Sequence, residues 1–219
     1  PLFEETRLFT RSLGETSDVV DKEMFTVPPR AEGGAPYSFR PEGTASAARA
    51  YVQGGCPTSA PFQKWFYLGP MFRYERPQKG RERQFTQFGV EVFGAQNPVL
   101  DAEVVDFALR FFENLGFGPE LEVRVNTMGD PNDRVRWKAQ LQDFFSDSLA
   151  GRCSDCQERF DRNPFRLLDC KVEKCQNLNE GVPSLRGQLA EESTAHHEEF
   201  LATLEALGHK PQDDPSIVR

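Results

Sequence analysis

The sequence lacks any long apolar run. A membrane-spanning helix needs about 20 consecutive apolar residues, and no stretch of these 219 residues comes near that length. The mean hydropathy is −0.58, and no segment has the charged, apolar and small-residue order of a signal peptide. We therefore expect a cytoplasmic protein without a membrane partner.

Histidine is also scarce. The three histidines are His196, His197 and His209, and no Ser-His-Asp or Cys-His arrangement is evident, which disfavours hydrolases that use a side-chain nucleophile. If the chain is catalytic, the nucleophile should come from a substrate. Because His196 and His197 stand in a charged helical segment, we expect both to be solvated.

Basic residues are fewer than acidic residues, 26 against 34, and the net charge is −8. One segment has the opposite charge excess. Between residues 73 and 83, two glutamates stand among five basic side chains, Arg73, Arg76, Lys79, Arg81 and Arg83. Local positive charge on an acidic chain indicates an anionic ligand, although a solvated charged turn is the ordinary alternative.

This basic loop joins two strand-like runs, residues 64–74 and 84–93. One face of the second run is mostly apolar, and the other carries Gln87 and Glu91 on either side of Gly89. An uncompensated buried polar group costs about 1–3 kcal/mol, so we predict that Gln87 and Glu91 meet a polar ligand in the space that Gly89 leaves. Arg73, at the end of the first run, is placed to hold a phosphate through two parallel hydrogen bonds.

Helices and antiparallel strands together predict an α+β fold rather than a doubly wound sheet. Further strands are expected at 23–27, 37–40 and 121–125, and Pro and Gly punctuate the turn between the first two. Helices are expected at four places, from Thr44 onward, at 101–115 as a core helix, at 131–150 and at 189–207. A chain of this length with 38% hydrophobic residues can bury one sizeable core and a smaller satellite domain.

Four of the five cysteines, Cys153, Cys156, Cys170 and Cys175, are spaced as a CxxC and a Cx4C pair. Four thiols in a loop-rich segment have the count for a zinc site, but the spacing of the second pair is less diagnostic. Free buried thiols are our prediction, structural zinc is the alternative, and no metal is assigned. Cys56 is expected to be a lone core or loop cysteine.

Two segments carry a family resemblance. GPMFRYERPQKGRERQFTQFGVEVFG at 69–94 resembles motif 2 of class II aminoacyl-tRNA synthetases in its bacterial histidyl-tRNA synthetase version, and FRPEGTASAARAYVQGG at 39–55 resembles that family's amino-acid-binding segment. The resemblance covers nearly the whole chain and implies an antiparallel sheet flanked by helices. It implies a catalytic core at 1–129, a small helical insertion domain at 130–210, and the start of a return to the core at 211–219.

The resemblance also leads us to expect a fragment. Pro1 stands where the end of motif 1, the dimer-forming element, would lie, and the rest of the catalytic core and an anticodon-binding domain would follow Arg219. The whole protein is then expected to be a homodimer. The fragment alone is not expected to complete adenylation.

The resemblance implies a histidine-tRNA ligase, which activates histidine with ATP and Mg²⁺ and transfers it to tRNA(His). By the match, Glu42, Thr44 and Gln87 bind the α-ammonium group of histidine, and Glu91 binds the imidazole. A carboxylate suits imidazole because an apolar side chain cannot supply the same polar pairing. For Thr44 the alternative is an ordinary helix N-cap.

On the ATP side, the match assigns Arg73 to the histidine carboxylate and the α-phosphate, as the catalytic residue. Arg81 would reach the terminal phosphate, Phe85 would stack on adenine, and Glu75 would meet the adenine edge. Such chemistry needs positioning and charge neutralisation more than a proton-transferring side chain. The alternative is a non-catalytic synthetase-like regulatory protein that senses histidine or tRNA.

Overall fold

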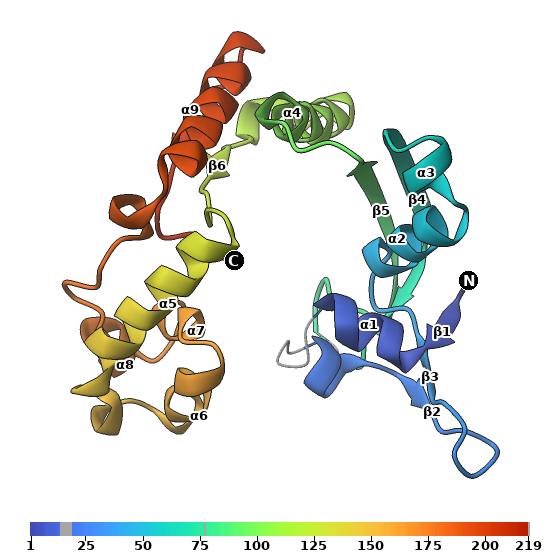
Figure 1. Ribbon diagram of the computed structural model, residues 1–219, viewed down its shortest axis with the longest axis horizontal. Coiled ribbons are helices and arrows are strands. Elements are labelled where there is room, and N and C mark those ends of the chain that lie inside the picture. The colour runs from blue at the N-terminus through green and yellow to red at the C-terminus, as the bar shows by residue number, and fades with distance from the viewer. Residues whose placement is uncertain (14–18, 77, 219) are drawn as a thin grey trace. The chain divides into compact units, whose positions relative to one another are not determined.

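The computed structural model describes residues 1–13, 19–76 and 78–218. The chain forms two compact units, Pro1–Ala95 and Gln96–Arg219, which are described separately below (Figure 1). The predicted divisions at residues 129 and 210 stay predictions. None of the helices in the described part is long and apolar enough to cross a membrane.

The first unit begins with a small antiparallel sheet. Strand β1 (Phe3–Glu5) leads into helix α1 (Thr6–Leu13), a π-helical turn covers Val19–Glu23, and β2 (Thr26–Val27) and β3 (Tyr37–Phe39) follow. The strand order is β1-β3-β2. The predicted strands at 23–27 and 37–40 therefore form and pair, but the first is only two residues long.

Helices α2 (Thr44–Gln53) and α3 (Cys56–Ser59) come next, followed by the two ten-residue strands β4 (Gln63–Phe72) and β5 (Gln84–Phe93). The two strands pair antiparallel along their whole length, with Tyr67 opposite Gly89, which confirms the predicted hairpin. After β5 the chain bends at Gly94, whose φ of 84° favours glycine.

Helix α2 packs against β5 on its polar face, not on its apolar one. Near the far end of that face, the rings of Tyr51 from α2 and Phe93 from β5 stack with centroids 4.5 Å apart. On the opposite face, Phe66 and Leu68 are 74% and 68% exposed and Phe88 is also exposed. The aromatic contacts with α2 explain why the polar face is the covered one.

The second unit contains a long helix pair. Helix α4 (Pro98–Asn114) starts at Asn97, whose Oδ1 accepts a hydrogen bond from the Val99 N–H at 2.8 Å, and it packs on α9 (Glu191–Ala206). The predicted helices at 101–115 and 189–207 are thus confirmed. The expected core character of the first is not, because only Ala102 of α4 is buried.

A short parallel pair joins distant parts of this unit. After a 3-10 turn, η2 (Gly118–Glu120), strand β6 (Arg124–Val125) pairs with β7 (Gln212–Asp213). The predicted strand at 121–125 is therefore shorter than expected, and its partner comes from the last residues of the chain.

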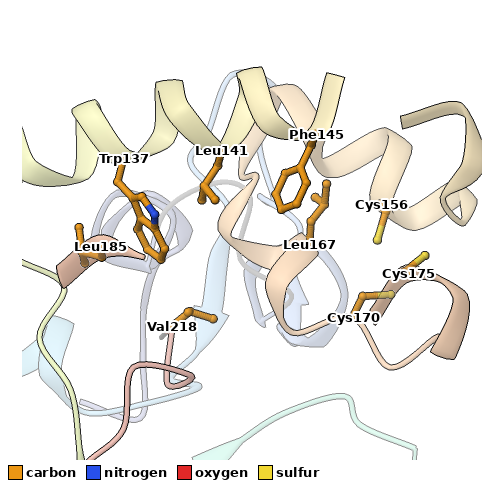
Figure 2. Packing of buried hydrophobic residues seen from close by; sticks show 9 residues of the cluster. All are labelled: Trp137, Leu141, Phe145, Cys156, Leu167, Cys170, Cys175, Leu185 and Val218. Atoms are coloured by element: carbon orange, nitrogen blue, oxygen red, sulfur yellow. The ribbon is translucent and has the colours of Figure 1, made fainter. Parts of the chain in front are cut away.

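The rest of the unit is helical, as predicted. It comprises α5 (Pro131–Ser146), η3 (Leu149–Gly151), α6 (Ser154–Arg162), α7 (Phe165–Leu168), α8 (Glu173–Asn177) and η4 (Leu185–Gln188). Its core contains Trp137, Leu141 and Phe145 from one face of α5, packed with Leu167 and Leu185 (Figure 2). Asp133 is fully buried near the start of α5 and accepts a hydrogen bond from Oγ of Ser193 at 2.5 Å.

One prediction about the histidines is wrong. His197 is only 4% exposed, and its Nε2 lies 2.9 Å from the Arg186 guanidinium and 3.2 Å from the Asp213 carboxylate. Burial, together with the charge of Arg186, lowers the pKa of His197. The neighbouring His196 is on the more exposed side of α9 and pairs with Asp101 at 2.8 Å.

Candidate active site

The first unit gathers the predicted histidine-binding residues around the start of α2. Thr44 is the first residue of that helix, and its Oγ1 donates a hydrogen bond of 2.6 Å to Oε1 of Glu91 on β5. The N-cap is Gly43, and the Thr44 side chain makes no capping bond. The N-cap alternative for Thr44 is therefore wrong, and the hydroxyl instead joins the helix to the polar strand face.

Glu42 holds the start of the helix. Its side chain is 8% exposed, and its two oxygens accept hydrogen bonds from the backbone N–H groups of Thr44 at 2.5 Å and Ala45 at 3.0 Å. A carboxylate at a helix N-terminus is also favoured by the helix dipole. Because an ionised carboxylate has about four acceptor positions, Glu42 retains capacity for a cationic ligand.

Tyr67 is a site residue that the sequence reasoning missed. It lies opposite Gly89 in the strand ladder, and a Cβ built on Gly89 or on Gly43 would overlap its ring. The space that Gly89 leaves is thus filled by Tyr67 and not by a ligand. Side chains on a strand alternate between its two faces. Counting along the first strand after pairing it with Gly89 would therefore have placed Tyr67 on the polar face.

The environment of Tyr67 ties it to the same residues. Burial raises the pKa of its hydroxyl; a hydrogen bond with Thr44 opposes that rise, and the charges of Glu91 and Glu42 add to it. The phenol therefore stays neutral and keeps a proton to donate. The Tyr67 hydroxyl therefore lies near the carboxylates of Glu42 and Glu91 and the hydroxyl of Thr44.

The side-chain oxygen of Gln87, Oε1, is an unsatisfied hydrogen-bond acceptor in the described part of the chain. It is buried and has no hydrogen-bond partner within the described residues. Leaving such an acceptor unsatisfied costs about 1–3 kcal/mol. The amide oxygen is therefore suited to accept a hydrogen bond from a ligand.

Arg73 and Phe85 lie together at one end of the site. The Arg73 guanidinium carbon is 5.2 Å from the centre of the Phe85 ring, and its Nε donates to the backbone oxygen of Pro41 at 2.9 Å. Pro41 directly precedes Glu42, so Arg73 is anchored next to the predicted ammonium-binding carboxylate. One edge of the guanidinium is used in this bond, and the remaining N–H groups can form a fork for an anion.

Glu75 and Arg81 lie in the loop and pair with each other. Nη1 of Arg81 donates to Oε2 of Glu75 at 3.0 Å, and the Arg81 side chain is 61% exposed. A surface pair of this kind contributes only about 0–1 kcal/mol, so a phosphate or an adenine edge can replace it. The roles predicted for Glu75 and Arg81 stay predictions.

The site combines two sets of binding groups. Carboxylates, a tyrosine and an amide oxygen at Gln87 suit a small ligand with N–H donors, and a guanidinium beside an aromatic ring suits an anion next to a planar group. No group of carboxylates that could hold a metal ion occurs in the first unit over the residues described.

Comparison with known proteins agrees with these features. The family model described as "Histidyl-tRNA synthetase" matches residues 1–129, which include the whole of this site. The chain belongs to the histidyl-tRNA synthetase family.

Family members resemble the chain along its full length. Proteins named histidine--tRNA ligase from Fervidobacterium nodosum and Desulforamulus reducens are 43% and 44% identical over 219 residues, which is 100% of this chain and 51% and 52% of theirs. The chain thus spans about half the length of the curated relatives that it matches.

Solved structures give the same result. The crystal structure of apo Staphylococcus aureus histidyl-tRNA synthetase matches with a TM-score of 0.74 and 34% identity, over 100% of this chain and 48% of that one. The mixed α+β fold with antiparallel sheets is therefore confirmed. A Bacillus halodurans protein described as an ATP phosphoribosyltransferase regulatory subunit/histidyl-tRNA synthetase shares the fold, with a TM-score of 0.55 and 17% identity over 95% of this chain and 55% of that one.

Proposed function

We propose that the protein containing this chain is a histidine-tRNA ligase. A histidine carboxylate oxygen attacks the α-phosphorus of ATP, the bond to the bridging oxygen breaks, and pyrophosphate leaves with that electron pair. A ribose hydroxyl at the 3′ end of tRNA(His) then attacks the acyl carbon and releases AMP. No side-chain nucleophile is needed, which fits a site built from carboxylates, amides and guanidinium groups.

The buried amide oxygen of Gln87 is the observation that carries the proposal. It lacks a partner among the described residues, on the strand face that also presents Glu91. In our proposal, Gln87 and Glu42 accept hydrogen bonds from the α-ammonium group, with Thr44 beside them, and Glu91 accepts one from the imidazole. Family membership supports this arrangement.

The ATP side of the proposal uses the other end of the strand face. Arg73 would bridge the histidine carboxylate and the α-phosphate, close to Phe85, which would stack on adenine. Arg81 would leave Glu75 for the terminal phosphate, and Glu75 would then meet the adenine edge. When bound to ATP, Mg²⁺ neutralises phosphate charge, and we assign it to no residue of this chain.

For the whole protein, we further propose a cytoplasmic homodimer in which the region 130–210 lies near the acceptor stem of the tRNA. That region contains equal numbers of basic and acidic residues from 130 to 175. Its contribution to tRNA binding would therefore come from local geometry and not from net charge.

The test is histidine-dependent exchange of pyrophosphate into ATP by the full-length protein. Gln87→Ala should raise the KM for histidine by roughly 10-fold or more, since truncating a hydrogen bond to a charged group costs about 1.5–3 kcal/mol. Thr86→Ala, one residue away on the exposed face of β5, is the matched control and should behave as the unmodified protein.

Two outcomes would count against the proposal. Equal KM values in the two variants would remove Gln87 from the site. A folded full-length protein that binds histidine but exchanges no pyrophosphate would instead be a regulatory, non-catalytic member of the family.

A further inference from the structure

Four cysteines from separate short helices converge at one point in the second unit. Cys153 is the N-cap of α6, Cys156 is in α6, Cys170 follows α7, and Cys175 is in α8. Their four Sγ atoms all lie within 4.8 Å of one another, and Figure 2 shows Cys156, Cys170 and Cys175 directed into the same space. None of the four forms a disulfide.

The sulfur separation fits a tetrahedral ion. Four sulfurs bound to zinc at about 2.3 Å are about 3.8 Å apart in a regular tetrahedron. Sγ of Cys153 and Sγ of Cys170 are 3.8 Å apart, whereas a disulfide would require about 2.05 Å. The spacing of the second cysteine pair in the sequence could not show that the four sulfurs converge. Their convergence depends on how α7 and α8 fold back.

We propose that Cys153, Cys156, Cys170 and Cys175 together bind one structural Zn²⁺ ion. Four thiolates fill every position of a tetrahedral zinc site, so the site has no open position for catalysis. The proposal replaces the free thiols favoured by the sequence alone.

A neighbouring buried charge supports the proposal independently. Arg152 is 4% exposed, and within the described part of the chain its guanidinium donates only to neutral oxygens, those of Ser148, Cys175, Leu178 and Asn179. A buried charge without a counter-charge is costly. Zinc with four thiolates carries a net charge of −2, and the Arg152 guanidinium, which donates to the backbone oxygen of Cys175 at 3.2 Å, would compensate part of it.

The backbone around the cluster also suits thiolates. The N–H of Cys153 donates to Sγ of Cys175 at 3.2 Å, and Cys153 stands at the N-terminus of α6, where the helix dipole favours negative charge. These contacts stabilise a negatively charged sulfur more than a neutral thiol.

The role of the ion follows from the size of the elements that it joins. Helices α6, α7 and α8 have nine, four and five residues, and helices shorter than about 12–15 residues are marginal on their own. A zinc ion would cross-link all three beside the core that Phe145 and Leu167 form. Metal binding would then contribute directly to the stability of this region.

The experiment measures metal content in the full-length protein, purified under reducing conditions from zinc-supplemented cells. The unmodified protein and Cys56→Ser should each contain one zinc per chain, because Cys56 lies outside the cluster. Cys170→Ser should contain almost none. Cys153→Ser, at the one partly exposed member of the cluster, is the milder variant and should lose zinc while remaining folded.

Cobalt provides a second readout that does not depend on a variant folding. Replacing zinc by Co²⁺ in the unmodified protein should give the intense visible bands of tetrahedral cobalt with sulfur ligands. Metal-free unmodified protein, iron in place of zinc, or full zinc occupancy in both Cys153→Ser and Cys170→Ser would overturn the proposal.

Discussion

Gly89→Ala should disturb the candidate site through a single contact. A Cβ at this position would overlap the ring of Tyr67, which lies directly across the β4–β5 ladder. The strand backbone cannot yield easily because it is paired along its whole length, so the ring must move. Gly43, at the N-cap of α2, also lies against this ring, because a Cβ built there would overlap it as well.

The expected cost follows from overpacking a filled site. An added methyl group that forces a side chain away from its position costs about 1–3 kcal/mol. Moving the ring would also break its hydrogen bond with Thr44. Thr44 is one of the proposed histidine-binding residues, so histidine affinity should fall about 5- to 150-fold over the same range.

The assay uses a fluorine label on Trp65, which is on β4 in the first unit. The fluorine NMR signal of Trp65, assigned by its loss in Trp65→Phe, reports unfolding of the first unit whatever other tryptophans the full-length protein contains. Urea unfolding of the full-length protein should show a lower midpoint for Gly89→Ala. Histidine affinity is measured by calorimetry on the same preparations.

The comparison with Gly43→Ala makes the test specific. Because both methyl groups displace the same ring, the double variant should lose less stability than the sum of the two single variants. Gly187→Ala is the control, since a Cβ there meets nothing within 4 Å. The reasoning fails if Gly89→Ala is as harmless as Gly187→Ala, or if the two losses add fully.

Other predictions concern the second unit, each measured as unfolding of the full-length protein. Leu141→Ala removes a fully buried side chain and should cost about 2–5 kcal/mol, whereas Val135→Ala, on the exposed face of the same helix, should cost under about 0.5 kcal/mol. Asp133→Ala leaves the buried donors that it bonds unsatisfied and should cost about 3 kcal/mol; exposed Asp155→Ala is the control, and equal losses would contradict the prediction. Because burial lowers the pKa of His197 below 6.5, its neutral form stabilises the fold above pH 6.5, and that stability should be lost as the pH falls through the folded-state pKa. A variant His197→Gln should lack this part of the pH dependence; an unchanged pH profile would refute the assignment.

Long periodic elements were predictable from the sequence. The helices at 98–114, 131–146 and 191–206 and the hairpin of β4 and β5 all occur where the period of apolar residues placed them. Short elements were less predictable. Strands β2 and β6 have two residues each, too few for a periodic pattern, and their extent depends on partners that come from elsewhere in the chain.

Burial was the least predictable property. His197 stands in a segment rich in charge, yet Arg186 and Asp213 lie beside it because of how α9 packs. The apolar residues of α4 were expected in a core, and only Ala102 is buried. Periodicity identifies the face of a helix but not what covers that face.

For the candidate active site and the cysteine cluster, the sequence by itself determined which residue types are present, and its resemblance indicated the protein family. The polar face of β5, the basic loop and the four cysteines can all be read directly from the chain. Only the tertiary structure decided which of these groups meet. Tyr67 fills the space at Gly89, Thr44 reaches Glu91, and four thiols come within 4.8 Å of one another. The reason is that spacing along one element fixes a face, whereas distances between elements depend on register and packing.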